Sequence, residues 1–293
     1  MPPAATLTEA RAPVFLTLPR WHRVRKHPTL IIGALLLIAV AIIAAAAPWI
    51  ATHDPQDIDP LARMLPPSAG HWFGTDALGR DVFSRAVWGA RVSLIVGVSV
   101  ALLATGLGVV IGLASGFVRW ADGFIMRVMD GLMAIPGILL AIALMAVTQA
   151  SLATVIVAIT VPEIPRVVRL VRSLALTLRE QPFVEAAHAV GTRLPMILAR
   201  HIVPGIVTPL MVLATFVAAA AVLTEAALSF LGVGVPTNTP SWGNMMAEGR
   251  NFVAQAFHII LYPGLLLAAT VLAINLLGDG LRDALDPRLA RQL

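Results

Sequence analysis

The sequence contains no cysteine and only one lysine, Lys26, among its 293 residues. Without cysteine there can be no disulfide scaffold, no Cys-ligated zinc or iron–sulfur site and no thiol nucleophile. Charge is also scarce, because 13% of the residues are charged, against roughly 25% in a soluble domain. Hydrophobic residues make up 58% and the mean hydropathy is +0.85. So apolar a chain cannot cover its surface with polar groups, and lipid must cover part of it.

Motifs for chemistry on this chain are missing as well. A Walker A loop, G-x-x-x-x-G-K-[ST], needs a lysine that reaches the phosphates, and Lys26 follows Arg25 outside any such motif. The seven histidines show no H-E-x-x-H spacing, and no G-x-S-x-G elbow is present. We therefore expect no enzyme, no catalytic residue, no metal site and no cofactor in this chain. Any ATP hydrolysis would occur on another polypeptide.

Long apolar stretches dominate what is present. Six of them approach or exceed the length needed to cross a bilayer: residues 30–47, 92–117, 125–147, 152–171, 204–231 and 257–277. The first could be a signal peptide, but it is longer than the roughly 7–15 residues of a signal core, and five more spans follow. The predicted fold class is an all-α polytopic membrane protein with six transmembrane helices.

The positive charges indicate the orientation of these spans. The net charge is +5 and the pI is about 11.1, but the arginines sit between apolar runs, so we expect no nucleic-acid partner. If the N-terminus is cytoplasmic, most of the 21 Lys and Arg residues fall in cytoplasmic segments. The exceptions are Arg63, Arg80, Arg85, Arg91 and Arg250. This bias follows the positive-inside rule and predicts that both termini are cytoplasmic.

Charged groups inside the spans are costly, at about 3 kcal/mol near a helix centre. Glu225 lies near the outer end of the fifth predicted span. It is a candidate residue of a translocation pathway or gate, or it makes a packing hydrogen bond or lies at the outer head groups. Glu163 precedes Arg166 by three residues and can pair with it on one helix face, and Arg127 and Asp130 repeat that spacing.

Small residues recur every fourth position in the second predicted span, at Ala104, Gly108, Gly112 and Gly116. Positions four apart share one face of a helix, where small side chains allow another helix to approach closely. The pattern therefore predicts a helix–helix contact, with a glycine-lined pore as the alternative.

Two loops outside the membrane carry turn-forming residues. The segment FGTDALGRD fits a turn that caps a helix from Asp81 onward, or an outer lip that contacts a solute-binding protein. Its candidate residues are Gly74, Thr75, Asp76, Gly79, Arg80 and Asp81. The loop at 232–256, with Pro236, Pro240 and Trp242, fits a structured lip or an aromatic anchor at the interface.

The cytoplasmic segment QPFVEAAHAVGTRLPMILARHIVP, residues 181–204, predicts two short helices. Pro182 and Glu185 suit a helix start, Gly191 suits its end, and Pro195 suits the first turn of a second helix. Before it, arginines at 166, 169 and 172 share one face and fit anchors at the lipid head groups. The result is a helix–turn–helix elbow with residues 196–198 (Met, Ile, Leu) near its tip. It has too little core to stand alone, so a partner should bind it.

Glu185-Ala186-Ala187, followed by Gly191 and then Pro204, resembles the EAA loop of the permease subunits of ABC importers. His201 stands where isoleucine is general, and His-Ile-x-Pro resembles the peptide-importer branch. Other segments resemble the C-type permeases of dipeptide, oligopeptide, nickel and glutathione importers. They include FGTDALGRD, ALSFLGVG at 227–234, PSWGNMM at 240–246 and NLLGDGLRDALDPRL at 275–289.

The resemblance implies a type I ABC importer permease fold in a bacterial cytoplasmic (inner) membrane. Its expected organisation is a cytoplasmic tail (1–28), a first transmembrane helix (29–48), a periplasmic loop (49–91), a five-helix core (92–281) that includes the EAA coupling loop (172–204), and a cytoplasmic tail (282–293). Within that loop, the residues implied to couple to the ATPase are Glu185, Ala186, Ala187, Gly191 and Pro204.

The resemblance also implies partners and a function. The partners are a second homologous permease forming a heterodimer, two ABC ATPases carrying ATP and Mg²⁺, a periplasmic or lipid-anchored solute-binding protein, and membrane lipid. The implied function is import of di- and oligopeptides, with nickel or glutathione as alternative solutes. The rival class is a secondary transporter that works without ATPases.

Overall fold

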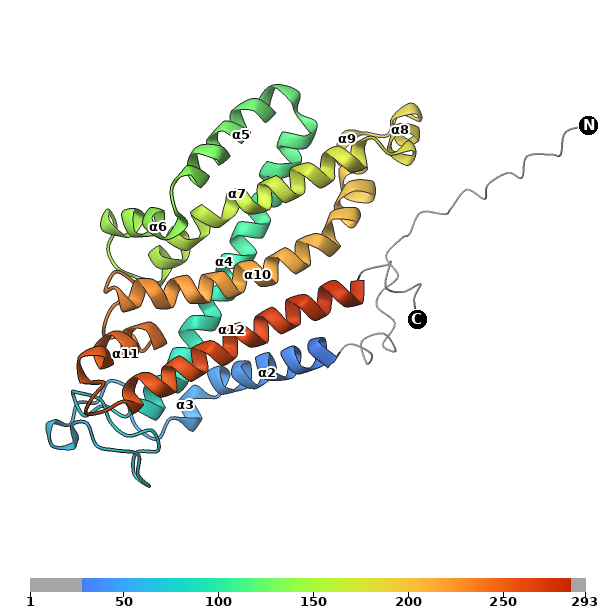
Figure 1. Cartoon of the computed structure of the whole chain (residues 1–293). Coiled ribbons are helices and arrows are strands. Elements are labelled where there is room, and N and C mark those ends of the chain that lie inside the picture. The colour runs from blue at the N-terminus through green and yellow to red at the C-terminus, as the bar shows by residue number, and fades with distance from the viewer. Residues whose placement is uncertain (1–27, 286–293) are drawn as a thin grey trace, which may run out of the picture.

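The computed structural model describes residues 28–285, and these residues form a helical bundle (Figure 1). The long helices are α2 (Pro28–Ala45), α4 (Val82–Phe117), α5 (Arg119–Ala134), α6 (Gly137–Ala146), α7 (Leu152–Arg179), α10 (Val203–Phe230) and α12 (His258–Leu285). The short elements are α3 (Ala47–Ile50), η1 (Pro60–Ala62), α8 (Pro182–Ala189), α9 (Leu194–Ile197), the π-turn η2 (Leu198–Ile202), α11 (Trp242–Gly249) and η3 (Arg250–Phe252). Apart from one isolated β-bridge, residues 28–285 contain no β-structure. The all-α fold class is confirmed.

Within residues 28–285, four helical segments are long and apolar enough to cross a membrane: α2, α4, the segment from α9 through α10, and α12. The pair α5 and α6 makes a fifth if it counts as one broken span. Helix α7, with 28 residues, is long enough to cross a membrane, but its arginines make it less apolar than the other spans. The count of six therefore stays a prediction, as does the location of the termini, because most of both predicted tails lies outside the described residues.

Helix α4 is longer than the predicted second span because it begins ten residues earlier. Asp81 is its N-cap, and the Asp81 side chain accepts a hydrogen bond from the backbone N–H of Ser84 at 2.8 Å. This confirms the predicted cap. With 36 residues, α4 is about 54 Å long, so it extends well beyond a hydrocarbon core of about 30 Å.

The small-residue face of α4 packs against α7. A Cβ atom added at Gly108 would lie 2.5 Å from Val167, one at Gly112 would lie 2.7 Å from Val171, and Gly116 is similarly close to Ala175. The partners on α7 are also four residues apart, so two matching stripes meet along several turns. The predicted helix–helix contact is confirmed at these positions.

Helices α2 and α12 form a second close pair (Figure 1). A Cβ at Gly33 would lie 2.5 Å from the backbone N of Leu277, and a Cβ at Gly280 would lie 2.5 Å from the backbone of Leu30. The opposite face of α2 exposes large apolar side chains, Ile32, Leu35, Ile38 and Ile42. That face suits contact with lipid.

The predicted third span, residues 125–147, is wrong as a single helix. The chain bends by 89° between α5 and α6. Ile135 has an extended backbone with ψ of 129°, as expected for a residue that precedes a proline, and Pro136 is the N-cap of α6. By contrast, α7 runs unbroken through Pro162 and Pro165.

Three arginines of α7, at positions 166, 169 and 172, each pair with an acid. Their placement at the lipid head groups stays a prediction. Arg166 pairs with Glu163 at 3.1 Å, as predicted from their spacing. Asp130 does not pair with Arg127 as predicted; it accepts from Arg169 across the α5–α7 contact at 2.6 Å. Arg172 donates two hydrogen bonds to the carboxylate of Asp122, and both donor–acceptor distances are 2.6 Å. The local spacing missed these pairs because α5 and α7 are adjacent only after folding.

Candidate functional site

The bundle has two differently built ends (Figure 1). At one end lie α8 and α9 with the turn between them, which we call the elbow (residues 180–202). At the other end, the chain before α4 and the chain around α11 come together in what we call the lip (residues 51–81 and 231–257). Helices α4, α7 and α10 connect the two ends.

The elbow forms because its sequence specifies both helix termini. Pro182 occupies the first turn of α8, where its missing N–H leaves no bond unmade. Gly191 adopts a left-handed backbone with φ of +78°. The N–H of Gly191 donates to the carbonyl of His188 at 2.9 Å, and the N–H of Thr192 donates to the carbonyl of Ala187 at 3.0 Å. These two bonds are the Schellman termination that glycine favours. The predicted helix–turn–helix is confirmed.

One face of the elbow is buried and the other is open. Ala187 and Ile197 are buried against the bundle, whereas Glu185, Ala186 and Gly191 are exposed. Within residues 28–285, Glu185 makes no ion pair. Of the residues predicted near the tip, Met196 is 55% exposed whereas Ile197 is buried, and Val190 (80% exposed) adds to the open apolar surface.

Contacts at its base fix the elbow to the bundle. The Arg179 guanidinium donates to the backbone carbonyl of Gly116 at 2.9 Å, at the end of α4. His201, the departure from the general EAA pattern, lies 6.1 Å from the ring of Phe183 between centroids. Pro204 occupies the first turn of α10, directly after η2. The exposed face of α8 is thus presented on a firmly anchored support.

In the lip, the FGTDALGRD segment is a tight turn whose residues each make a specific contact. Gly74 and Gly79 have φ of +75° and +82°, conformations that favour glycine. A Cβ at Gly79 would also lie 1.8 Å from the carbonyl oxygen of Asp59. The Thr75 hydroxyl accepts from the N–H of Leu65 at 2.8 Å and donates to the carbonyl of Ala62. The predicted turn is confirmed.

Four charged side chains form a cluster beneath this turn, in which Asp76, Arg80 and Arg85 are buried and Glu248 is 28% exposed. The Asp76 carboxylate accepts from Arg80 Nε at 2.7 Å and from Arg85. Glu248, on α11, accepts from Arg80 at 2.5 Å and from Arg85 at 2.7 Å. Arg85 is 2% exposed and Asp76 is 1% exposed. Two cations therefore face two anions, which compensates the cost of removing these charges from water.

The second half of the lip is anchored on α4 through Trp242. Its indole Nε1 donates to the carbonyl of Ala86 at 2.8 Å, and the side chain is fully buried. A Cβ at Gly89 would lie 2.8 Å from the Trp242 ring. This confirms the structured lip and excludes a role for Trp242 as an aromatic anchor facing the bilayer.

Glu225 lies fully buried in α10, close to the lip. Its Oε1 accepts a hydrogen bond from the hydroxyl of Ser229 at 2.8 Å. That geometry fits the packing hydrogen bond that was one interpretation of this residue.

The sequence did not single out Arg85 or Glu248 as partners, because 163 residues separate them. No local signal links the two positions. The only indication was that both fall in segments assigned to the same side of the membrane.

An apolar helical bundle with an open elbow at one end and a closed lip at the other has the architecture of a membrane transport permease. Residues 104–291 match the family described as the binding-protein-dependent transport system inner membrane component. Residues 20–67 match the N-terminal TM domain of oligopeptide transport permease C. The chain belongs to this family of ABC importer permeases, in its peptide and oligopeptide branch, and is a multi-pass protein of the bacterial inner membrane.

Similar proteins align with this chain over nearly its whole length. A probable peptide ABC transporter permease protein, y4tQ of Sinorhizobium fredii, is 53% identical over 268 residues, covering 92% of each chain. A putative peptide transport system permease protein of Brucella abortus is 47% identical over 279 residues, covering 95% of this chain and 93% of the relative. The glutathione transport system permease protein GsiD of Escherichia coli is 44% identical over 273 residues, covering 92% and 89%.

A solved structure supports the fold. A chain of the MetNI methionine ABC transporter superposes with a TM-score of 0.52 at 21% identity, covering 70% of this chain and 97% of that chain. The agreement covers nearly all of the smaller chain, so the ABC importer permease fold is confirmed.

Proposed function

We propose that this chain is the permease subunit through which an ATP-driven importer moves di- and oligopeptides across the inner membrane. The proposal of peptides draws on the two relatives described as peptide permeases, at 53% and 47% identity. The chain itself carries no Walker A lysine, so ATP and Mg²⁺ would bind to two ABC ATPase subunits. A second, homologous permease and a periplasmic or lipid-anchored solute-binding protein would complete the complex.

The observation that carries this proposal is the open face of the elbow. Glu185, Ala186 and Gly191 are exposed there beside Val190 and Met196. An apolar patch with one acidic group fits a groove on a protein partner. In the proposed complex the elbow faces the cytoplasm and enters an ATPase groove, where Glu185 pairs with a basic group. The lip then faces the periplasm and the solute-binding protein.

Glutathione is the second candidate solute. It is supported by GsiD, at 44% identity over 92% of this chain. Glutathione is itself a tripeptide, so both solutes demand recognition of a peptide backbone and charged ends. Neither nickel import nor transport without ATPases gains support from the relatives named above.

Uptake competition separates these candidates. The four-part complex with its binding protein is reconstituted in proteoliposomes loaded with ATP, and entry of a labelled dipeptide is measured against unlabelled oligopeptide, glutathione or Ni²⁺. We expect peptides to compete and Ni²⁺ to leave uptake unchanged. If only glutathione is taken up with ATP, the proposed solute is glutathione and not di- or oligopeptides. Uptake without ATPases would overturn the importer proposal.

Coupling through the elbow is tested by Gly191→Val. A β-branched residue in a left-handed backbone costs about 1–2 kcal/mol and would reshape the turn. We expect uptake and ATPase co-purification to fall together. The matched control is Gly70→Val in the lip, where a Cβ meets nothing within 4 Å. Normal uptake by the Gly191→Val complex would overturn the coupling role.

A further inference from the structure

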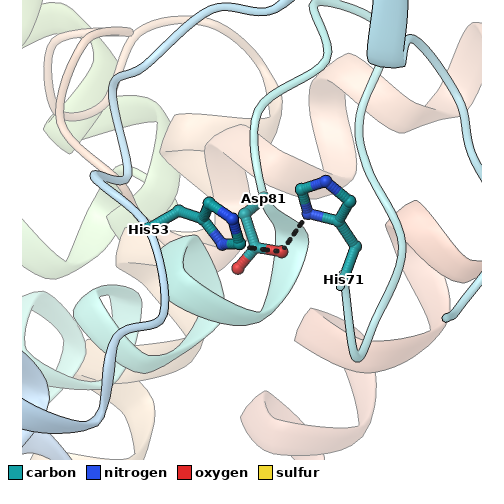
Figure 2. Close-up of side chains that lie close together, drawn as sticks. All are labelled: His53, His71 and Asp81. Atoms are coloured by element: carbon teal, nitrogen blue, oxygen red, sulfur yellow. Dashed lines mark hydrogen bonds and ion pairs between the residues drawn. The ribbon is translucent and has the colours of Figure 1, made fainter. Parts of the chain in front are cut away.

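A cluster of imidazole and carboxylate groups lies in the lip, apart from the charged cluster already described. Figure 2 shows His53, His71 and Asp81, which come from the segment after α3, the loop before the FGTDALGRD turn and the N-cap of α4. One ligand-type atom from each residue lies within 4.8 Å of the other two. Because these residues come from three separate segments, no sequence spacing could reveal the group.

The two histidines approach the same carboxylate oxygen. His71 Nδ1 lies 2.9 Å from Asp81 Oδ1, and His53 Nδ1 lies 3.9 Å from that atom. The two rings are stacked, with centroids 4.7 Å apart and planes inclined by 28°. In a tetrahedral zinc site, with bonds of about 2.1 Å, neighbouring ligand atoms are about 3.4 Å apart. The two distances to Asp81 Oδ1 lie on either side of that value, and all three ligand atoms lie within 4.8 Å of one another. Binding of one ion would therefore require the side chains to rotate toward it.

The carboxylate of Asp81 is divided between two tasks. Oδ2 accepts from the backbone N–H of Ser84 at 2.8 Å and so caps α4. The Thr52 hydroxyl donates to the same oxygen at 3.3 Å. Oδ1 faces the histidines. The cap therefore holds Asp81 in position without using the oxygen that a cation would need.

The backbones of both histidine segments are also held in place. The N–H of His53 donates to the Ser84 hydroxyl at 3.1 Å. The N–H of His71 donates to the Ser68 hydroxyl at 3.2 Å, and the carbonyl of His71 accepts from the N–H of Gly74 at 2.9 Å. The first of these bonds holds the segment that carries His53 close to the N-terminus of α4, and the other two fix the turn that carries His71.

Access to the cluster is from one side. The side chain of Asp81 is 1% exposed, that of His71 is 21% exposed and that of His53 is 43% exposed. His53 also lines a cavity of about 670 Å³ together with Asp54, Trp88 and Arg91. Three protein ligands would leave the fourth position of a tetrahedral zinc site to a water or exchangeable ligand.

We propose that His53, His71 and Asp81 bind a divalent transition-metal ion of the Zn²⁺ class, as a site on the permease itself. Two imidazoles and one carboxylate suit Zn²⁺ or Ni²⁺ and disfavour Mg²⁺ and Ca²⁺, which prefer oxygen ligands. The ion links the segment after α3 to the start of α4 and so closes one side of the lip. This site is independent of the transported solute.

Zinc titration tests the site directly. The intact transporter complex, purified without a polyhistidine tag and stripped with EDTA, is titrated with Zn²⁺ by calorimetry and assayed for metal by mass spectrometry. The variants are His53→Gln, His71→Gln and Asp81→Asn, and asparagine keeps the N-cap. The matched control is His188→Gln, an exposed histidine on α8 at the opposite end.

We expect the wild-type complex and the His188→Gln complex each to bind one additional Zn²⁺ per permease compared with the three variants. If a variant still binds that ion, its affinity should be lower by more than about tenfold. Zinc should raise the melting temperature of the wild type but not of Asp81→Asn, and X-ray absorption should show two imidazole ligands. Equal zinc binding by wild type and variants, or a spectrum without imidazole, would overturn the site and leave only a His71–Asp81 hydrogen bond. Neither result depends on which solute is transported.

Discussion

Arg85 on α4 and Glu248 on α11 form an ion pair at 2.7 Å in which the arginine is 2% exposed. The same guanidinium bonds to Asp76, so one side chain joins the FGTDALGRD turn, the second lip segment and the start of α4. The lip is therefore held together by charge and not by an apolar core alone. Such a cluster fixes one arrangement, because a shifted register would leave a buried charge without a partner.

Removing the arginine should destabilise the lip. Arg85→Met leaves two carboxylates to share Arg80, and breaking a buried pair costs about 3–5 kcal/mol. We expect a clear fall in the melting temperature of the detergent-purified protein. Arg91→Met is the control, because Arg91 is exposed on the same helix and lies over the Trp88 ring at 5.5 Å. Equal melting temperatures for the two variants would contradict the structural role of the cluster.

Filling the small-residue contact should weaken the α4–α7 pair. Gly108→Ala places a Cβ 2.5 Å from Val167, and overpacking of this kind typically costs about 1–3 kcal/mol. Gly106→Ala is the matched control, since a Cβ there meets nothing within 4 Å. We expect lower thermal stability only for Gly108→Ala.

Combining Gly108→Ala with Val167→Ala makes room for the new methyl group. We expect the double variant to be more stable than the sum of the single effects predicts, which is the signature of direct contact in a double-mutant cycle. Strict additivity would show that the two residues do not touch.

Reversing the charge of Glu185 should disturb partner binding without disturbing the fold. Glu185 is exposed and makes no ion pair within the part of the chain that the structure describes. For Glu185→Lys we expect an unchanged melting temperature of the isolated chain and reduced recovery of ATPase subunits in mild detergent. Asp57→Lys, at an exposed position in the lip, should retain them. Equal loss in both variants would indicate a general charge effect.

Trp242 offers a graded test of the lip anchor. Trp242→Phe removes the bond to the Ala86 carbonyl and should cost about 1 kcal/mol. Trp242→Ala also leaves a cavity and should cost about 3–5 kcal/mol. Trp49→Ala, at an 83% exposed position, serves as the control. Thermal unfolding should show the largest loss for Trp242→Ala, a smaller loss for Trp242→Phe and the smallest for Trp49→Ala. A Trp242→Ala protein as stable as Trp49→Ala would refute the anchoring.

Features specified by neighbouring residues could be predicted from the sequence. The Asp81 cap, the Gly191 helix end and the spacing of Gly108 and Gly112 depend on a few consecutive turns, where steric and hydrogen-bonding rules are local. The family resemblance added the EAA elbow, whose geometry is confirmed although its partner is still a proposal.

Features set by tertiary contact could not be predicted in this way. Asp130 pairs with Arg169 and not with Arg127, because α7 lies beside α5. Pro136 stands at the break between α5 and α6, whereas Pro162 and Pro165 lie inside the unbroken helix α7. The approach of His53 to Asp81 likewise depends on loops whose paths no periodicity describes.

The interlocking of α4 with α7 along Gly108, Gly112 and Gly116 has a mechanical consequence. Helix α8 follows α7 after a turn at Glu180 and Gln181, and the lip is fastened to the opposite end of α4 through Arg85 and Trp242. Because the two small-residue stripes interlock over several turns, we expect α4 and α7 to shift together as one rigid pair. The 89° bend between α5 and α6 lies outside that pair.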